Sequence, residues 1–211
     1  MQAKWLSCED PWTNERPIAS APPEPATFLV ACRLVPEKGV HIPIEAAALA
    51  RVPWRLRIAG DGPERASLMQ RVAALHLGDR VELLGHVPPA RLQQLMAEAT
   101  AVLLPSLWYE TFGLTAIEAF AAGRPVVASA LGAMQEVVDD HSGVRIPAGD
   151  VAAWANSLDA LASDAARVAL LGNGARARYE RHFTPSHDAD RLLAAYRSLP
   201  RPAPAASTSP S

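Results

Sequence analysis

The chain is organised around one stretch, Pro105-Ser-Leu-Trp-Tyr-Glu-Thr-Phe-Gly-Leu-Thr-Ala-Ile-Glu118. It follows a short apolar run at residues 101–104, of the kind that a parallel strand buried on both faces produces. An almost wholly apolar helix is predicted after it, at residues 114–122. The stretch therefore predicts a strand, a turn and a helix, and the turn lies at the carboxyl end of the strand, where open α/β sheets bind ligands.

Two carboxylates mark this unit, Glu110 in the turn and Glu118 as the one charge of the predicted helix. An acidic residue near a helix start is favourable through the helix dipole alone, so a purely structural role stays open for Glu110. Glu118 is expected to be buried by its apolar neighbours. A buried carboxylate without a partner is costly, so Glu118 should accept hydrogen bonds from the protein or from a ligand.

The start of the predicted helix suits an anion. The amides of Phe112, Gly113 and Leu114 have no intrahelical acceptors, because the first turn of a helix leaves its N–H groups unpaired. Gly113 also permits a close approach to the backbone. An anion such as phosphate is therefore expected beside these three residues.

The composition describes an ordinary globular protein with one good-sized domain. The chain has 211 residues, of which 49% are hydrophobic, and 20 basic residues face 22 acidic ones, which gives no sign of a nucleic-acid partner. It lacks an apolar run of about 20 residues that would span a membrane, and its start lacks the apolar core of a signal peptide. Cys8 and Cys32 are expected to be free thiols, and the cytoplasm is the expected compartment.

Strands and helices alternate along the chain. Strands are predicted at residues 27–32, 54–59, 80–84, 101–104, 126–129 and 143–146, and helices at 41–51, 64–75, 88–99, 114–122, 132–139, from 150–161 on to about 181, and at 186–199. This order implies right-handed βαβ units, and hence an α/β fold with a Rossmann-like parallel sheet of about six strands, helices on both faces and C-terminal helices. Residues 1–26 are expected to be a linker or the remnant of a missing N-terminal domain, residues 27–199 the functional domain, and residues 200–211 a disordered tail.

Six motifs fall in order along this frame. They are Arg33-Leu-Val-Pro-Glu-Lys-Gly39, Gly60-Asp-Gly-Pro63, Pro105-Ser106, Glu110-Thr-Phe-Gly-Leu with Glu118-Ala119, Gly123-Arg-Pro-Val-Val127, and Gly143 with Pro147-Ala-Gly-Asp150. As a set they resemble the carboxyl-terminal, donor-binding domain of family 4 retaining glycosyltransferases, which have the GT-B fold. The resemblance covers about residues 27–199. It implies a domain that binds a nucleotide-diphospho-sugar for retaining transfer of the sugar to an unknown acceptor.

The resemblance implies a catalytic set of Arg33, Lys38 and Glu110. The two cations would bind the pyrophosphate of the donor and neutralise the charge that develops on the leaving diphosphate. Glu110 would accept hydrogen bonds from hydroxyls of the transferred sugar. No metal or other cofactor is expected, since two fixed cations already face the phosphates.

The resemblance also implies donor-binding residues. Glu118 would accept hydrogen bonds from the two ribose hydroxyls, and the amides of Phe112, Gly113 and Leu114 would hold phosphate or sugar oxygens. The remaining donor contacts are assigned to Gly60, which would let its loop pass close to the donor, and to His86 and Val87, which would lie beside the nucleobase.

The sequence departs from the family pattern in three places. Cys32 stands where a glycine usually precedes the arginine, and Ala133 stands where a second glycine usually follows Gly132; both would crowd the donor pocket. Residues 1–26 are too few for an acceptor domain. The expected macromolecular partners are therefore a separate acceptor domain or, through self-association, a second copy of the chain. The isolated chain is expected to bind the donor without transferring sugar.

Two other classes of protein compete with this interpretation. A non-catalytic nucleotide-sugar-binding module, or a degenerate fragment, would keep the same motifs and is the alternative function. A Rossmann-like dehydrogenase is disfavoured, because no Gly-x-Gly-x-x-Gly follows the first predicted strand.

Overall fold

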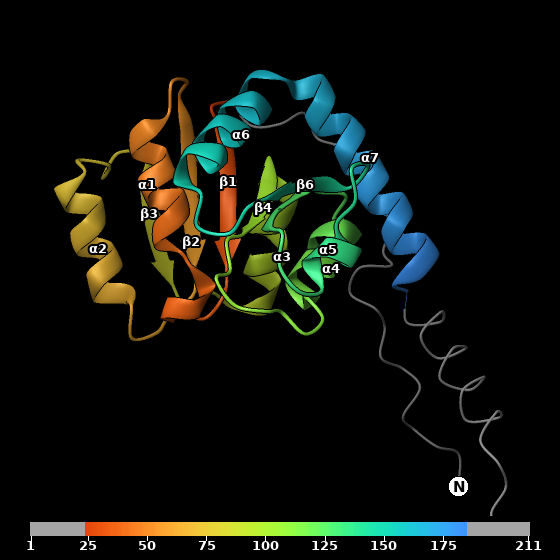
Figure 1. Cartoon of the computed structure of the whole chain (residues 1–211), viewed down its shortest axis with the longest axis horizontal. Helices are drawn as coiled ribbons and strands as arrows, with labels where there is room; N and C mark the ends of the chain where they lie inside the picture. The colour runs from red at the N-terminus through yellow and green to blue at the C-terminus, as the bar shows by residue number, and fades with distance from the viewer. Residues whose placement is uncertain (1–23, 185–211) are drawn as a thin grey trace, which may run out of the picture.

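The computed structural model of the chain describes residues 24–184 and contains one six-stranded parallel sheet (Figure 1). Its strands are β1 (Ala26–Ala31), β2 (Trp54–Ala59), β3 (Val81–Gly85), β4 (Ala101–Leu104), β5 (Val126–Ser129) and β6 (Gly143–Ile146). They lie in the order β3-β2-β1-β4-β5-β6. This is the doubly wound order in which the topology reverses between β1 and β4, so the predicted fold class is confirmed.

The first strand is the middle of this arrangement. β1 is buried along its whole length and pairs in parallel with β2 on one side and β4 on the other. Phe28 is aligned with Leu56 of β2 and with Ala101 of β4. The loops that follow β1 and β4 therefore leave the sheet side by side, and these loops carry the candidate catalytic residues.

Helices cover both faces of the sheet. They are the 3-10 turn η1 (Pro36–Lys38), α1 (His41–Leu49), α2 (Arg65–Ala74), α3 (Pro89–Glu98), α4 (Leu114–Ala121), α5 (Met134–Val137), α6 (Val151–Ser163) and α7 (Ala165–His182). One apolar core lies between the sheet and α1, α2 and α6, and a second lies between the opposite face and α3, α4 and α5. The long helix α7 contributes to both, so it closes the sheet beside β6 (Figure 1).

Several element boundaries differ from the sequence-based ones, most of them by one or two residues. β1 begins at Ala26 and α1 ends at Leu49, where the chain turns to place the N–H of Arg51 on Asp159. The predicted helix at 132–139 shrinks to the four residues of α5. Gly132 has a φ of +52°, outside the right-handed helical region, and Val138 is already extended, so neither belongs to the helix. The predicted helix at 186–199 lies outside the described residues.

The loops after the strands are tied together by their backbones. The N–H of Leu34 donates to the carbonyl of Asp61 at 2.9 Å, and that of Gly60 donates to Gly85 at 2.8 Å. The N–H of Leu107 donates to the carbonyl of Glu37 at 2.8 Å, which joins the loop before α4 to η1. These bonds fix the loops that form the candidate site. Within residues 24–184, no helix combines the length and the apolar character that crossing a membrane requires.

Candidate functional site

The loop between β4 and α4 brings a carboxylate onto a cation from the loop after β1. The Lys38 ammonium donates to Oε1 of Glu110, although the two residues lie 72 positions apart in the chain. The Ser106 hydroxyl, which is buried, donates to the same oxygen at 2.7 Å. Two of the three predicted catalytic residues, Lys38 and Glu110, therefore meet in one cluster at the carboxyl edge of the sheet.

The electrostatics of this cluster hold Glu110 ionised. Burial alone would raise its pKa, but the hydrogen bonds from Lys38 and Ser106 and the positive charge of Lys38 outweigh that effect, and the pKa of the Glu110 carboxyl lies below its ordinary value. The backbone behind it is fixed as well. The N–H of Ala133 donates to the Glu110 carbonyl at 3.2 Å, and a Cβ on Gly132 would lie 3.0 Å from that oxygen.

The start of α4 has the form that the sequence predicts. Gly113 is the N-cap with a φ of +80°, and a Cβ there would lie 2.1 Å from Cε of Met134. A side chain would therefore be strained and would collide. The amides of Phe112, Gly113 and Leu114 donate no hydrogen bond to any group in the described part of the chain. They remain available to an anion.

Glu118 lies one turn further along α4. The sequence predicts that its side chain is buried, whereas in the structure it is only partly buried. The reason is that α4 begins at the open edge of the sheet, where Leu114 in its first turn is also exposed. Its carboxylate makes no hydrogen bond or ion pair within residues 24–184. Burial, with no partner to compensate, raises its pKa.

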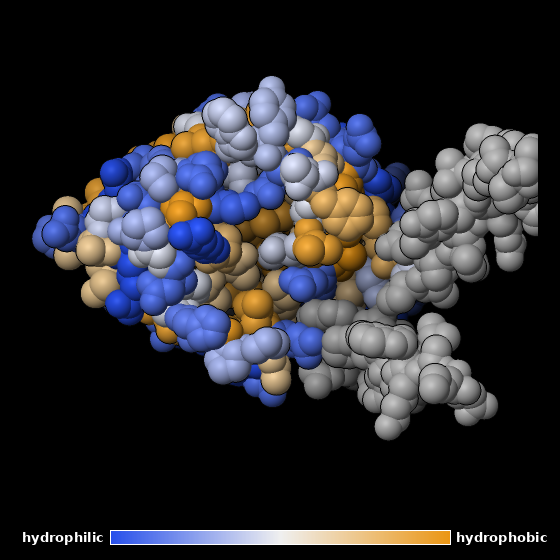
Figure 2. Space-filling model, turned by 90° about the horizontal axis from the view of Figure 1, so that it is seen from below, coloured by the Kyte–Doolittle hydropathy of each residue, from blue (hydrophilic) through white to orange (hydrophobic). Residues whose placement is uncertain are grey.

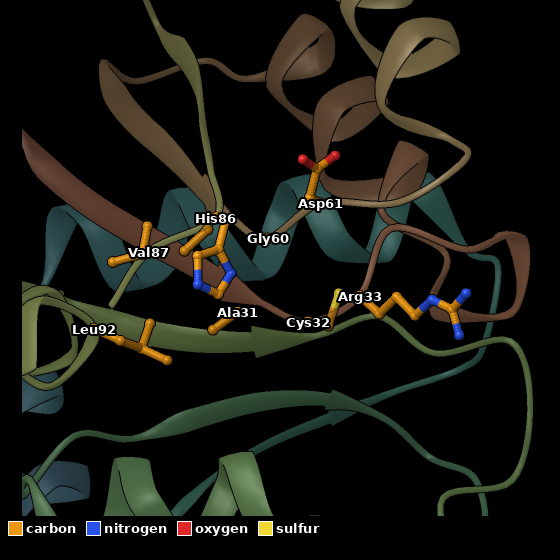
Figure 3. A pocket seen from close by; sticks show the side chains of 9 residues that line it. Ala31, Cys32, Arg33, Gly60, Asp61, His86, Val87 and Leu92 are labelled. Atoms are coloured by element: carbon orange, nitrogen blue, oxygen red, sulfur yellow. The ribbon is translucent and has the colours of Figure 1, made fainter. Parts of the chain in front are cut away.

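The ends of β1, β2 and β3 form a pocket of about 360 Å³ that contains four of the predicted residues (Figure 3). It is lined by Ala31, Cys32, Arg33, Ala59, Gly60, Asp61, His86, Val87 and Leu92. The His86 ring lies over the end of β1, whereas the Arg33 side chain extends along the loop away from it (Figure 3). Arg33 is exposed and forms no ion pair among the described residues, so its charge is free to meet a ligand.

The two single-residue departures from the family pattern, Cys32 and Ala133, are accommodated by the fold. Cys32 lines the pocket, and its burial raises the pKa of the thiol to about 11, so the thiol is neutral near pH 7. Gly60 has a φ of +150°, and a Cβ there would lie 1.8 Å from the Cys32 carbonyl oxygen, which explains why a glycine is needed in this loop. Ala133 has a φ of −58° as the N-cap of α5, a conformation that alanine adopts without strain.

The predicted site residues thus form two groups at one edge of the sheet. Arg33, Gly60, His86 and Val87 line the pocket, whereas the pair of Lys38 with Glu110 and the start of α4 lie beyond its lining. Ser106 is a residue that the sequence reasoning did not assign to the site. The available signal was its position two residues after the end of β4, four positions before Glu110.

The loop before α4 and the first residue of that helix carry exposed apolar side chains. They are Leu107, Trp108, Tyr109, Phe112 and Leu114, with the two aromatic residues before Glu110 exposed by 69% and 67%. Figure 2, which views the molecule from below in the orientation of Figure 1, shows apolar residues in a hollow near the middle of this face and polar residues around it. A hollow of this kind, rimmed by polar groups, is typical of a binding surface.

The fold is that of one Rossmann-like half of a GT-B protein, and comparison with known proteins gives the family. The chain matches the family described as "Glycosyl transferases group 1" over residues 13–178 and belongs to it. The predicted resemblance is therefore confirmed. Within the described residues, no group of three or more His, Cys, Asp or Glu side chains is placed to hold a metal ion.

Individual relatives share this domain. The D-inositol 3-phosphate glycosyltransferase of Stackebrandtia nassauensis is 38% identical over an alignment of 179 residues, which covers 79% of this chain and 40% of the relative. The glycogen synthase of Mycobacterium tuberculosis is 34% identical over an alignment of 212 residues, gaps included, which covers 96% of this chain and 48% of the relative. The chain thus spans less than half the length of these curated relatives.

Solved structures agree. HepE of Anabaena in complex with UDP-glucose is 28% identical, with a TM-score of 0.76 over 82% of this chain and 49% of that one. The sucrose-phosphate synthase of Thermosynechococcus elongatus is 33% identical, with a TM-score of 0.71 over 82% of this chain and 45% of that one.

Proposed function

We propose that this chain supplies the donor side of a retaining glycosyl transfer, by binding a nucleotide-diphospho-sugar at the carboxyl edge of its sheet. The observation that carries the proposal is the convergence of two loops. The loop after β1 brings Arg33 and Lys38, and the loop after β4 brings Glu110 and three unpaired amides, to one edge. Cations and amides match phosphate oxygens, whereas a carboxylate matches sugar hydroxyls.

In this proposal the contacts of Lys38 change when the donor binds. Without a ligand its ammonium donates to Glu110. A diphosphate carries more negative charge than one carboxylate and would take one or more of the three ammonium donors, while Arg33 meets it from the other side. The leaving diphosphate would then be neutralised without a metal ion, and the Glu110 carboxylate would turn to the hydroxyls of the sugar.

The pocket and Glu118 hold the nucleoside in the same proposal. His86 and Val87 would flank the base, and the unpaired carboxylate of Glu118 would accept hydrogen bonds from the two ribose hydroxyls. The exposed apolar side chains of the β4–α4 loop would face an acceptor domain in the cytoplasm, either in the same longer protein or in a separate one.

Titration calorimetry of the chain with UDP, UDP-glucose and uridine tests this proposal. Binding of both diphosphates, with at least tenfold weaker binding of uridine, is the expected result, and Arg33→Ala should remove that preference. Arg167→Ala is the matched control, because this arginine is exposed on α7, away from the site. Equal affinity for UDP and uridine would contradict the diphosphate assignment. A donor-hydrolysis and transfer assay on the same samples separates a transferase half from a binding module.

A further inference from the structure

A second pocket lies at the opposite edge of the sheet, where the strands begin. It has a volume of about 420 Å³ and is formed by residues at and before the starts of β2 and β3, together with Pro25 before β1. Three arginines line it, Arg51, Arg55 and Arg80, against one carboxylate, that of Asp79. Three positive charges and one negative charge leave this lining with a net charge of +2, whereas the whole chain has a net charge of −2.

Arg80 is held rigidly in this lining. Its N–H donates to the carbonyl of Leu77 at 3.0 Å, and its carbonyl accepts from Leu56 at 2.8 Å, so the backbone is fixed at the start of β3. Its guanidinium carbon lies 5.5 Å from the centroid of the Trp54 ring, a cation–π distance.

Trp54 in turn is anchored from both sides. Its ring is buried, its Nε1 donates to Asp159 at 2.9 Å, and it packs edge-on against Phe28. The second oxygen of Asp159 accepts from the N–H of Arg51 at 2.9 Å, which fixes the neighbouring backbone. The pocket therefore has a preformed wall, and a ligand would not need to order it.

One donor in this wall has no acceptor. Nη2 of Arg80 is buried and has no hydrogen-bond partner within residues 24–184, whereas Nε of the same guanidinium donates to the carbonyl of Trp54 at 3.5 Å. A buried donor without an acceptor is unfavourable, and an anion bound beside this guanidinium would compensate that cost. The side chains of Arg51 and Arg55 form no ion pair in the described part of the chain either, whereas Arg57, two positions further along β2, pairs with Glu82 and Glu98.

We propose that this pocket binds a phosphate group, either free phosphate or the headgroup of an anionic lipid. Guanidinium groups offer paired N–H donors whose spacing fits phosphate oxygens, and a dianion would balance the excess charge of +2. Arg80 would supply the fixed donor, and Arg51 and Arg55 would close over the ligand. Asp79 is exposed, and its negative charge would repel the anion and so weaken its binding.

Phosphate binding is measured on the full chain carrying Arg33→Ala and Lys38→Ala, which weaken phosphate binding at the candidate donor site. Titration with inorganic phosphate, followed by calorimetry and by the melting temperature, should show saturable binding. Arg80→Gln should weaken it about tenfold, and Asp79→Asn should strengthen it several-fold. Arg51→Gln, an exposed change, should also weaken it and keeps the test valid if Arg80→Gln fails to fold. Arg167→Gln should have no effect.

The two sources of phosphate are separated with vesicles. Co-sedimentation with vesicles of phosphatidylcholine and phosphatidic acid, but not with phosphatidylcholine alone, would identify a headgroup, provided that Arg51→Gln reduces it. Binding of inorganic phosphate without vesicle binding would identify a free phosphate. Absence of both, or binding that is unchanged in Arg51→Gln and Asp79→Asn, would overturn the proposal.

Discussion

Glu110 and Glu118 lie on the same strand-turn-helix unit, separated by seven residues, and their surroundings act on them in opposite directions. In the turn, Glu110 receives Lys38 and Ser106, and its pKa is lowered. In α4, Glu118 is half-buried and has no partner among residues 24–184, and its pKa is raised. The difference shows which carboxylate has its partners within the protein. The charged form of Glu110 stabilises the fold, whereas the charged form of Glu118 destabilises it until a ligand supplies hydrogen bonds.

The largest expected effect is a loss of UDP affinity when either of the two cations in the loop after β1 is removed. Arg33→Ala and Lys38→Ala should each weaken UDP binding by roughly 10- to 100-fold, since a hydrogen bond to a charged group contributes about 1.5–3 kcal/mol. Uridine binding should hardly change. Calorimetry with both ligands is the measurement, and equal losses for UDP and uridine would show that these cations do not meet the diphosphate.

The next effect concerns the glycine between the two carboxylates. Gly113→Ala should destabilise the protein by about 1–2 kcal/mol, because the left-handed conformation penalises a Cβ and because Met134 must move. In a chain of this size, each kcal/mol lowers the melting temperature by about 2–4 °C. Ala116→Gly, in the first turn of the same helix, controls for a general loss of helix stability. An unchanged melting temperature in Gly113→Ala would contradict the described helix start.

Glu110→Gln tests how much the charge of Glu110 contributes to the free energy of unfolding. Because the folded-state pKa of Glu110 is lowered, its stabilising effect is present above the ordinary pKa of a glutamate and disappears as the pH falls through the lowered value. The variant should therefore be less stable than the parent at pH 7 by about 1 kcal/mol, and equally stable in strong acid. Denaturant unfolding across this pH range is the measurement. A difference that does not depend on pH would mean that the ion pair with Lys38 contributes nothing.

Glu118→Gln should give a smaller effect of the opposite sign. The raised pKa means that the folded protein binds this proton more tightly than the unfolded chain, so the charged form is destabilising above the raised pKa, and the penalty fades as the pH falls through it. The variant should match or exceed the parent in stability at pH 7, and the gain should vanish at about pH 4. A loss of stability at pH 7 would show that Glu118 has a structural partner.

Much of the fold was accessible from the sequence, for physical reasons. The strands β2, β4, β5 and β6 were placed at their observed boundaries. β4 and β5 are short apolar segments buried on both faces, whereas β2 alternates apolar residues with arginines, as a partly exposed strand does. The degree of burial of Glu118 was not accessible. Apolar neighbours along a helix do not reveal that its first turn faces an open edge, and this depends on the tertiary arrangement.

The sequence predicted candidate site residues that the structure brings to one edge of the sheet, but it did not predict the contacts among them. Arg33, Lys38 and Glu110 were expected to meet a ligand, and nothing in the spacing indicates that Lys38 and Glu110 pair with each other in its absence. The part of Ser106 was missed for the same reason: a serine after a strand is common, and its role depends on where its hydroxyl points. Contacts between distant loops depend on the order of the strands in the sheet. The sequence predicts a parallel α/β sheet but not that order.

The most direct test of this account is the affinity of Glu118→Gln for UDP relative to 2′-deoxy-UDP, measured by calorimetry next to the parent chain. The account assigns the unpaired carboxylate to the ribose hydroxyls. The parent should therefore prefer UDP by about tenfold, and the variant should lose most of that preference without losing stability at pH 7. An unchanged preference together with a lower melting temperature would contradict the account, because it would make Glu118 a structural residue and leave the ribose to be recognised elsewhere.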